Sequence, residues 1–188
     1  SQNQNTTGVT KTSTATDRLG NVGNGSVTVK LDKGAPTIAF SSRSPAANTN
    51  GWNNSNVTVS WTCDDSVSGA VASSVSQVVS TEGSNQSAIG TCTDNAGNIA
   101  QDTRTGINID KTLPTLTATG SPAPTNGWNK TDVVVSYTCT DDRSGVDTGA
   151  SDLANDTLTA TGTANGSCKD KAGNVKTTSY TAQIDKAP

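Results

Sequence analysis

The sequence predicts an all-β protein made of small β-sandwich repeats arranged end to end. Three observations carry this prediction: a unit that occurs twice at a constant offset, short stretches in which apolar and hydroxyl residues alternate, and a composition with 30% hydrophobic and 3% aromatic residues. So few apolar residues cannot fill one large core in a chain of 188 residues. They can fill the cores of several small units, which is what the repeat implies.

The repeat is defined by four phrases that each occur twice, three of them at one identical offset. They are Asn-Gly-Trp-Asn (50–53 and 126–129), Val-x-Val-x-aromatic-x-Cys (57–63 and 133–139), Cys-x-Asp-x-Ala-Gly-Asn (92–98 and 168–174) and Ile-Asp-Lys (109–111 and 184–186). The last phrase is followed by proline within three residues in both copies. Several independent anchors at one offset establish the repeat.

A partial third copy precedes these two. Asp-x-x-Gly-Asn at 17–21 matches the turn phrase, and Leu-Asp-Lys at 31–33 matches the closing phrase. We therefore expect residues 1–34 to be the C-terminal half of a preceding repeat, and residues 35–111 and 112–188 to be complete repeats. Half a sandwich cannot close its own core, so the first segment must be completed by another chain segment or be ordered only by its neighbours.

Within a repeat, short strands alternate with turn clusters. Apolar residues at positions 57, 59, 61 and 63 alternate with hydroxyl residues, which is the pattern of a half-buried strand. Further strands are expected over 37–40, 75–80, 86–93 and 104–109, and no window supports a helix. About six or seven short strands in one repeat are typical of a β-sandwich.

Each repeat also carries two aspartate turns. An aspartate can accept hydrogen bonds from the N–H groups of its own turn, and a following glycine can take the left-handed backbone conformation. The predicted turn residues are Asp65, Gly69, Asp94, Gly97, Asn98, Asp141, Gly145, Asp170, Gly173 and Asn174. The proline after each closing phrase ends the last strand and leaves a joint too short for a flexible linker.

The ordered set of phrases resembles the immunoglobulin-like repeats of the Big type found in bacterial proteins. The likeness covers essentially the whole chain through Asn-Gly-Trp, Val-x-Val, Asp-x-x-Ser-Gly, Asp-x-x-Gly-Asn and Ile-Asp-Lys. The resemblance implies immunoglobulin-like sandwiches in a large secreted or surface protein, where such repeats form stalks, adhesin segments and spacers of carbohydrate-active enzymes. Related modules decorate phage particles. The cysteines depart from the pattern, because many of these repeats lack them.

The four cysteines fall two in each repeat: Cys63 with Cys92, and Cys139 with Cys168, with the same spacing in both. Pairing within a repeat resembles the bridge that joins the two sheets of immunoglobulin domains. Each bridge would stabilise its repeat by roughly 3–4 kcal/mol in the chain-entropy model and would indicate an oxidising compartment. The alternatives are free buried thiols, or a zinc site that needs all four cysteines because histidine is absent.

Two sets of residues are candidates for ligand binding. Six aspartates offer the oxygen atoms that Ca²⁺ takes, without a calcium-loop motif around them: Asp64, Asp65, Asp94, Asp141, Asp142 and Asp170. We expect these aspartates to cap turns, and we predict no cofactor. Trp52 and Trp128 lie in loop phrases from which they could stack on a sugar or a protein. We expect them instead to cover the ends of their sandwiches.

The composition argues against catalysis, nucleic-acid binding and membrane insertion. The chain has no histidine, and adjacent aspartates on open turns provide no cleft for glycoside hydrolysis. A net charge of -3 leaves no basic footprint for nucleic acid. No stretch approaches the roughly 18 apolar residues of a membrane helix. We therefore expect a protein that is not an enzyme.

The expected function is structural: a stalk, fibre or adhesin segment of a large extracellular or cell-surface repeat protein. Its expected partners are neighbouring repeats of the same protein, with self-assembly into a surface filament through the incomplete first repeat as a further hypothesis. One alternative is a glycan- or protein-binding module that acts through Trp52 and Trp128. The other is a spacer of a secreted carbohydrate-active enzyme or of a phage particle.

Overall fold

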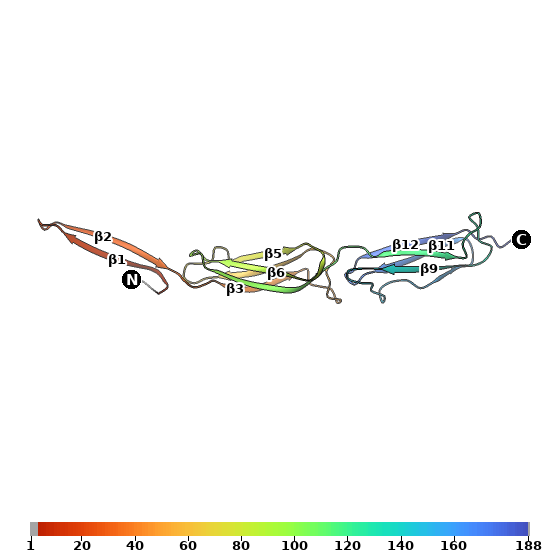
Figure 1. Ribbon diagram of the computed structural model, residues 1–188, viewed down its shortest axis with the longest axis horizontal. Coiled ribbons are helices and arrows are strands. Elements are labelled where there is room, and N and C mark those ends of the chain that lie inside the picture. Colours follow the sequence, from red (N-terminus) through yellow and green to blue (C-terminus); the bar gives the residue numbers. More distant parts are fainter. Residues whose placement is uncertain (1–3, 188) are drawn as a thin grey trace. The chain divides into compact units, whose positions relative to one another are not determined.

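The computed structural model describes residues 4–187, and the regular secondary structure of that part is β-strand without a helix. The all-β prediction is confirmed. The strands follow one another along the chain as shown in Figure 1. They are β1 (Thr6–Thr16), β2 (Val22–Leu31), β3 (Thr37–Ser44), β4 (Val57–Asp64), β5 (Ser74–Val79), β6 (Gly83–Thr93), β7 (Ile99–Ile109), β8 (Thr115–Ser121), β9 (Val133–Thr140), β10 (Asp156–Leu158), β11 (Gly162–Lys169) and β12 (Val175–Ala182).

The strands expected in the first complete repeat coincide with β3 to β7. The largest difference is in β7, which begins at Ile99 rather than near residue 104. The added residues, 99–103, are mostly polar and show no alternation of apolar and polar side chains. They belong to the strand because β7 pairs with β6 as a hairpin around the turn at 94–98. Backbone pairing therefore extends the strand beyond the stretch in which apolar residues reveal it.

The contacts divide the chain into two compact units, and each is described by itself. The first unit consists of the chain up to Ser44, Thr58–Val79 and Ser87–Thr105, and the second of Pro45–Val57, Ser80–Gln86 and the chain from Gly106 onward. This division runs through β4, β6 and β7. The expected boundaries between residues 34 and 35 and between 111 and 112 stay a prediction.

In the first unit, β1 and β2 form an antiparallel hairpin, and β3, β4 and β5 form a three-stranded sheet. The indole of Trp61 on β4 is fully buried, and its Nε1–H donates to Asp102 at 2.6 Å. This hydrogen bond, joined by one from Arg104, holds the pKa of Asp102 below its usual value. Arg104 also lies 4.6 Å from the centre of the Phe40 ring.

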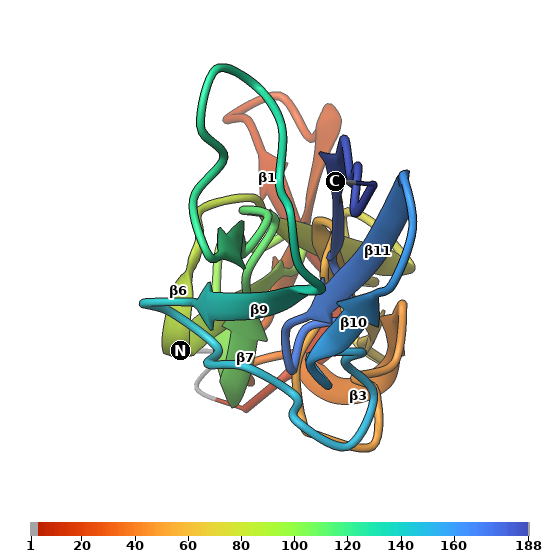
Figure 2. The ribbon, with the colours of Figure 1, turned by 90° about the vertical axis from the view of Figure 1, so that its right-hand side faces the viewer.

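In the second unit, the sheets β10–β9–β8 and β11–β12 share one core. Figure 2 looks toward β9, β10 and β11 of this unit. The buried residues come from both sheets: Leu116, Val133, Val135, Tyr137, Ala164, Cys168 and Ala182. Along β9 the buried side chains alternate with exposed ones, so the pattern read from the sequence is the pattern of burial.

An aromatic ring lies directly over a glycine in both units. A Cβ added to Gly90 would stand 2.4 Å from Trp61, and one added to Gly166 would stand 2.5 Å from Tyr137. Both distances are far inside van der Waals contact, so the absence of a side chain makes room for the ring. The two glycines hold the same position in their repeats, as the two rings do.

We expect Gly166→Ala to destabilise the protein by about 1–3 kcal/mol, because the added methyl group overpacks the core against the Tyr137 ring. Gly149→Ala is the matched control, since Gly149 is exposed and its Cβ would meet only Asp147 Oδ1 at 3.7 Å. Denaturant unfolding of both variants measures the difference. Equal stability of the two variants would contradict this account.

A second prediction concerns alkaline pH. Burial, followed by a hydrogen bond of 2.8 Å to the Asp156 carboxylate, raises the pKa of Tyr137 to about 12. An unfolded tyrosine ionises near pH ~10, so only the unfolded state loses this proton between the two values. The stability linked to Tyr137 is thus complete below pH ~10 and is lost as the pH rises through the folded pKa.

Tyr137→Phe should therefore lose less unfolding free energy than the native chain between pH ~9 and ~11.5. Unfolding in denaturant at these two pH values measures the difference, because the other alkaline groups titrate in both proteins. The same loss in both proteins would show that Tyr137 ionises normally in the folded state.

Candidate metal centres

The turn after β4 is organised by one carboxylate oxygen. Oδ1 of Asp65 accepts hydrogen bonds from the N–H groups of Val67, Ser68 and Gly69 at 2.8–3.0 Å. Gly69 has a φ of 83°, a conformation that favours glycine. Burial acts to raise the pKa of Asp65, but these three backbone donors hold it below its ordinary value.

The turn between β6 and β7 has a similar design. Oδ1 of Asp94 accepts from the N–H groups of Ala96 and Asn98, and Oδ2 accepts from the Asn98 side chain at 2.8 Å. The two contacts made by the asparagine recur between Asn174 and Asp170, and between Asn21 and Asp17 in the β1–β2 hairpin. All three copies of the Asp-x-x-Gly-Asn phrase therefore form one kind of turn.

A third aspartate comes from the closing phrase that precedes each complete repeat. Asp32 accepts from the N–H of Ser68 through Oδ2 at 3.2 Å. Its own carbonyl oxygen accepts from the side chain of Asn98 at 3.3 Å. Asp110 makes the matching contacts one repeat later, with Ser144 and Asn174. The joint is thereby tied to both turns of the repeat that comes after it.

These contacts gather two trios of carboxylates: Asp32, Asp65 and Asp94 in the first unit, and Asp110, Asp141 and Asp170 in the second. Within each trio one oxygen of every residue lies within 4.8 Å of the others. Each trio contains at least one buried residue. Clustered carboxylate oxygens are ligands that Ca²⁺ prefers, so the two trios are candidate sites for a divalent cation.

The two trios differ in their nearest positive charge. Nε of Arg143 lies 3.8 Å from Asp110, and its guanidinium also reaches Glu82 at 3.8 Å. Val67 stands at the matching position beside the first trio, where it brings no charge. The second trio therefore has a guanidinium beside it that the first trio lacks.

The sequence-based set of calcium candidates is divided by the structure. Asp65, Asp94, Asp141 and Asp170 lie in the trios, whereas Asp64 and Asp142 do not belong to either one. Asp32 and Asp110 were missed, because at least two strands and their loops separate each of them from its partners along the chain. The signal that could have found them is their place in the closing phrase, which precedes both complete repeats.

The structure forms both disulfides. Cys63 of β4 is bonded to Cys92 of β6, and Cys139 of β9 is bonded to Cys168 of β11, with Cα atoms 5.7 and 6.2 Å apart. In the second unit the bridge joins the two sheets that share the core. No cysteine in the described part of the chain is free.

The two loop tryptophans have different surroundings. Trp52 is half-buried, and Trp128 is 51% exposed beside a cavity of about 420 Å³ that it lines with Pro122 and Lys130. The buried residue of each Asn-Gly-Trp-Asn phrase is instead the last one, Asn53 or Asn129.

Asn53 connects its loop to the end of the last strand. Its side chain donates to the carbonyl of Ala46 at 2.9 Å, its backbone N–H donates to Asn108, and its carbonyl accepts from the N–H of Asp110. Asn129 makes the same type of backbone contacts with Gln183 and Asp185. A reason for the recurrence of the phrase is therefore this buried amide, which the sequence did not single out.

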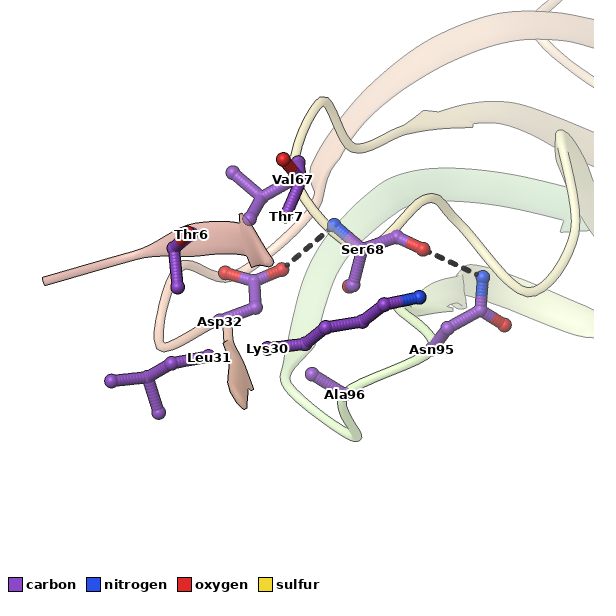
Figure 3. Close-up of a pocket in the computed structure, with 9 residues that line it drawn as sticks. All are labelled: Thr6, Thr7, Lys30, Leu31, Asp32, Val67, Ser68, Asn95 and Ala96. Carbon is purple, nitrogen blue, oxygen red and sulfur yellow. Dashed lines mark hydrogen bonds between the residues drawn. The ribbon is translucent and has the colours of Figure 1, made fainter. Parts of the chain in front are cut away.

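A further cavity of about 430 Å³ lies next to the first trio (Figure 3). It is lined by residues of β1 and β2 and by Asp32, Val67, Ser68, Asn95 and Ala96. Figure 3 shows the hydrogen bonds that join Ser68 to Asp32 and to Asn95 across one side of it.

Comparison with models of protein families and with curated proteins gives no match. Among solved structures, one match covers 94% of this chain and 74% of the other chain, at 19% identity and a TM-score of 0.37. It is described as "Structural insight into host cell surface retention of a 1.5-MDa bacterial ice-binding adhesin". A likeness at this TM-score does not assign a function to the chain.

The described residues include no helix of the length and apolar character that a membrane span requires.

We expect Ca²⁺ at millimolar concentration to raise the melting temperature of the chain, because it would offset the repulsion within the trios. Asp65→Asn should weaken this response, since the amide keeps an oxygen for the turn but removes one charge. Asp64→Asn is the matched control, because Asp64 is exposed and lies outside the trio. Differential scanning calorimetry with and without Ca²⁺ makes the comparison.

Val67→Arg tests the same prediction by adding a positive charge beside the first trio. It would place a guanidinium where Arg143 stands in the second unit, and should reduce the effect of Ca²⁺ on melting. A native chain whose melting temperature is the same in Ca²⁺ and in chelator would show that the trios only cap turns.

Proposed function

We propose that the chain is a structural segment of a large extracellular protein, in which immunoglobulin-like β-sandwich repeats follow one another end to end. The proposal is of a stalk or adhesin segment that performs no catalysis. The observation that carries it is the joint at residues 110–112, whose hydrogen bonds reach residues both before and after it. A linker held in this way transmits force or sets spacing rather than allowing free movement.

The contacts with preceding residues involve Lys111. Its backbone N–H donates to Glu82 at 2.5 Å, and its Nζ donates to Asn56 and to the carbonyl of Ser80, both at 2.6 Å. The hydrogen bond from Lys111 is also the largest cause that lowers the pKa of Glu82.

The contacts with following residues involve Asp110 and Thr112. The side chain of Asn174 donates to the carbonyls of both, at 2.9 and 3.1 Å. Asp110 further accepts from the N–H of Ser144 at 3.0 Å. Asp110, Lys111 and Asn174 of the repeated phrases therefore all help to fix the joint, which supports a repeat array as the functional unit.

The two disulfides support the extracellular part of the proposal. Disulfides of this structural kind form and persist in secreted and surface proteins, and are rare where thiols are kept reduced. Each joins cysteines at the same sequence separation, 29, in a unit with few buried apolar side chains. Such a thin core gains most from a covalent link.

A second candidate function is binding through the loop at 122–131. Trp128 is half exposed beside a cavity, an arrangement in which an indole can stack on a sugar or insert into a protein surface. Trp128→Ala against Trp52→Ala is the matched comparison on a glycan array. Binding that is lost only in the first variant would favour this function.

Limited proteolysis tests the stalk proposal. We expect trypsin to cut after Lys111 at least about 100-fold more slowly than after Arg18, because the joint must open before it fits a protease. Arg18 lies in the exposed turn of the β1–β2 hairpin and serves as the internal reference. Asn174→Ala should speed cleavage after Lys111 and leave cleavage after Arg18 unchanged.

Equal rates at the two sites would describe a flexible joint and would overturn the stalk proposal.

Mass measurement after alkylation, with and without reductant, tests the compartment in the same preparation. We expect no alkylated cysteine before reduction of protein from its natural source and four after it. Alkylation without reductant would contradict the extracellular assignment.

A further inference from the structure

The hairpin β1–β2 is the counterpart of β11–β12. When the sequence is aligned so that Asp17 matches Asp170, the two hairpins align without a gap. The strand register is also the same, because Val9 pairs with Val29 as Gly162 pairs with Ala182. The hairpin therefore has the form of the two-stranded sheet of a repeat.

In the second unit, the inner face of β11–β12 is covered by the three-stranded sheet. Ala164, Cys168 and Ala182 are 5%, 0% and 3% exposed there, in one core with Val133 and Val135. The ring of Tyr180 lies over the backbone of Gly120 on β8, where a Cβ would stand 2.3 Å from it.

The matching face of β1–β2 has no such cover in the described chain. It consists of Val9, Lys11, Ser13, Ala15, Gly23, Gly25, Val27 and Val29, which are cross-strand partners on one side of the hairpin. Val27 is 58% exposed at the position that Tyr180 occupies in β12. The opposite side is made largely of threonine, serine and asparagine, as expected of a face in contact with water.

The joint next to the hairpin is uncovered in a corresponding way. Ala96 is exposed and lines the cavity of about 430 Å³, whereas its counterpart in the next repeat, Ala172, is 4% exposed. At the second joint, the side chain of Asn48 donates to the carbonyl of Lys171 at 2.8 Å. Asn50 of the same loop donates to Asp147 at 3.3 Å. That loop joins β3 to β4 and so belongs to the first half of a repeat.

We propose that this face of β1–β2 and the adjoining cavity together form a docking surface for a half-repeat. The partner is a three-stranded antiparallel sheet with a Val-x-Val strand facing the hairpin and an asparagine-bearing loop that fills the cavity, the chemistry of residues 34–85. The inference rests on the proposed function, because it takes the repeat as the unit of assembly. It adds the surface and the partner that completes it.

Two residues of the hairpin restrict which half-repeat fits. Ser13 stands where both complete repeats have a glycine under an aromatic ring, so the partner carries a small side chain in place of that ring. Ala15 stands where the repeats have Cys92 and Cys168, so no disulfide joins the partner at this point.

Lys11 adds a charge to the surface. The matching residues of the repeats, Ala88 and Ala164, are 0% and 5% exposed. A partner that covers Lys11 must therefore present a carboxylate to its ammonium group or leave the end of the side chain in water.

A grafted chain tests the proposal. A copy of residues 34–85, carrying Trp61→Ala and Cys63→Ala, replaces residues 1–8, so that it enters β1 as it enters β6 in the natural chain. Both the graft and its ungrafted reference carry Lys11→Ala, so that an unpaired charge does not oppose docking. We expect amide hydrogen exchange over residues 9–16 and 22–31 to slow by at least about 100-fold in the grafted chain.

The graft also tests the restriction by Ser13. If the copy keeps its tryptophan, protection should be at least about 10-fold smaller, because the indole meets the Ser13 side chain. Ser13→Gly in that chain should restore the protection. A graft that keeps Trp61 and protects equally well with serine or glycine at position 13 would overturn the restriction.

Val57→Asp and Val59→Asp in the copy are the control, and should return exchange in the hairpin to the ungrafted rate. Unchanged exchange in the first graft, with β11–β12 still protected, would overturn the docking surface alone. Loss of protection in β11–β12 of the ungrafted chain would instead count against the proposed repeat array. Protection of the hairpin that rises with concentration in the ungrafted chain would assign the surface to a second copy and overturn the half-repeat.

Discussion

The organisation of this chain depends on the hydrogen bonds that the aspartate of the closing phrase accepts. Asp110 is fully buried, and it accepts from its own joint through Oδ1 and from the turn of the following repeat through Oδ2. A buried charge is tolerated only with such partners, and replacing it leaves polar groups without them. One side chain thus makes the end of one strand and the first turn of the next repeat interdependent, which explains why the phrase recurs with so little change.

The sequence predicted the strands and the bridges well because both depend on short-range patterns. Alternation along β4 and β9 is a direct record of which side chains face the core. Equal spacing of the cysteines indicated the pairing, although only the structure chooses it over free thiols. The strand β7 was too short in the prediction, because hairpin pairing fixes a strand through polar residues that carry no pattern.

Contacts between distant residues were harder to predict. Nothing in the sequence near Asp32 shows that it meets Asp94, because the meeting requires the strands between them to be in place. The Asn-Gly-Trp-Asn phrase was interpreted through its tryptophan, whereas the buried residue is the asparagine that comes after it. An aromatic residue is readily noticed in a sequence because it can bury a large apolar area. A buried amide that hydrogen-bonds to backbone groups restricts its position in the fold as strongly.

The same buried asparagines restrict how the protein can be made. Asn53 and Asn129 each begin an Asn-x-Ser/Thr triplet, the acceptor sequence for N-linked glycans, and they are 4% and 3% exposed. A secretory host that attaches glycans during translocation meets these triplets before the loop has closed. A glycan on either asparagine would occupy the amide that donates to Ala46 or Pro122 and would be too bulky to bury. Folding and glycosylation at these positions are therefore mutually exclusive, and a host without N-glycosylation is the appropriate source of the folded chain.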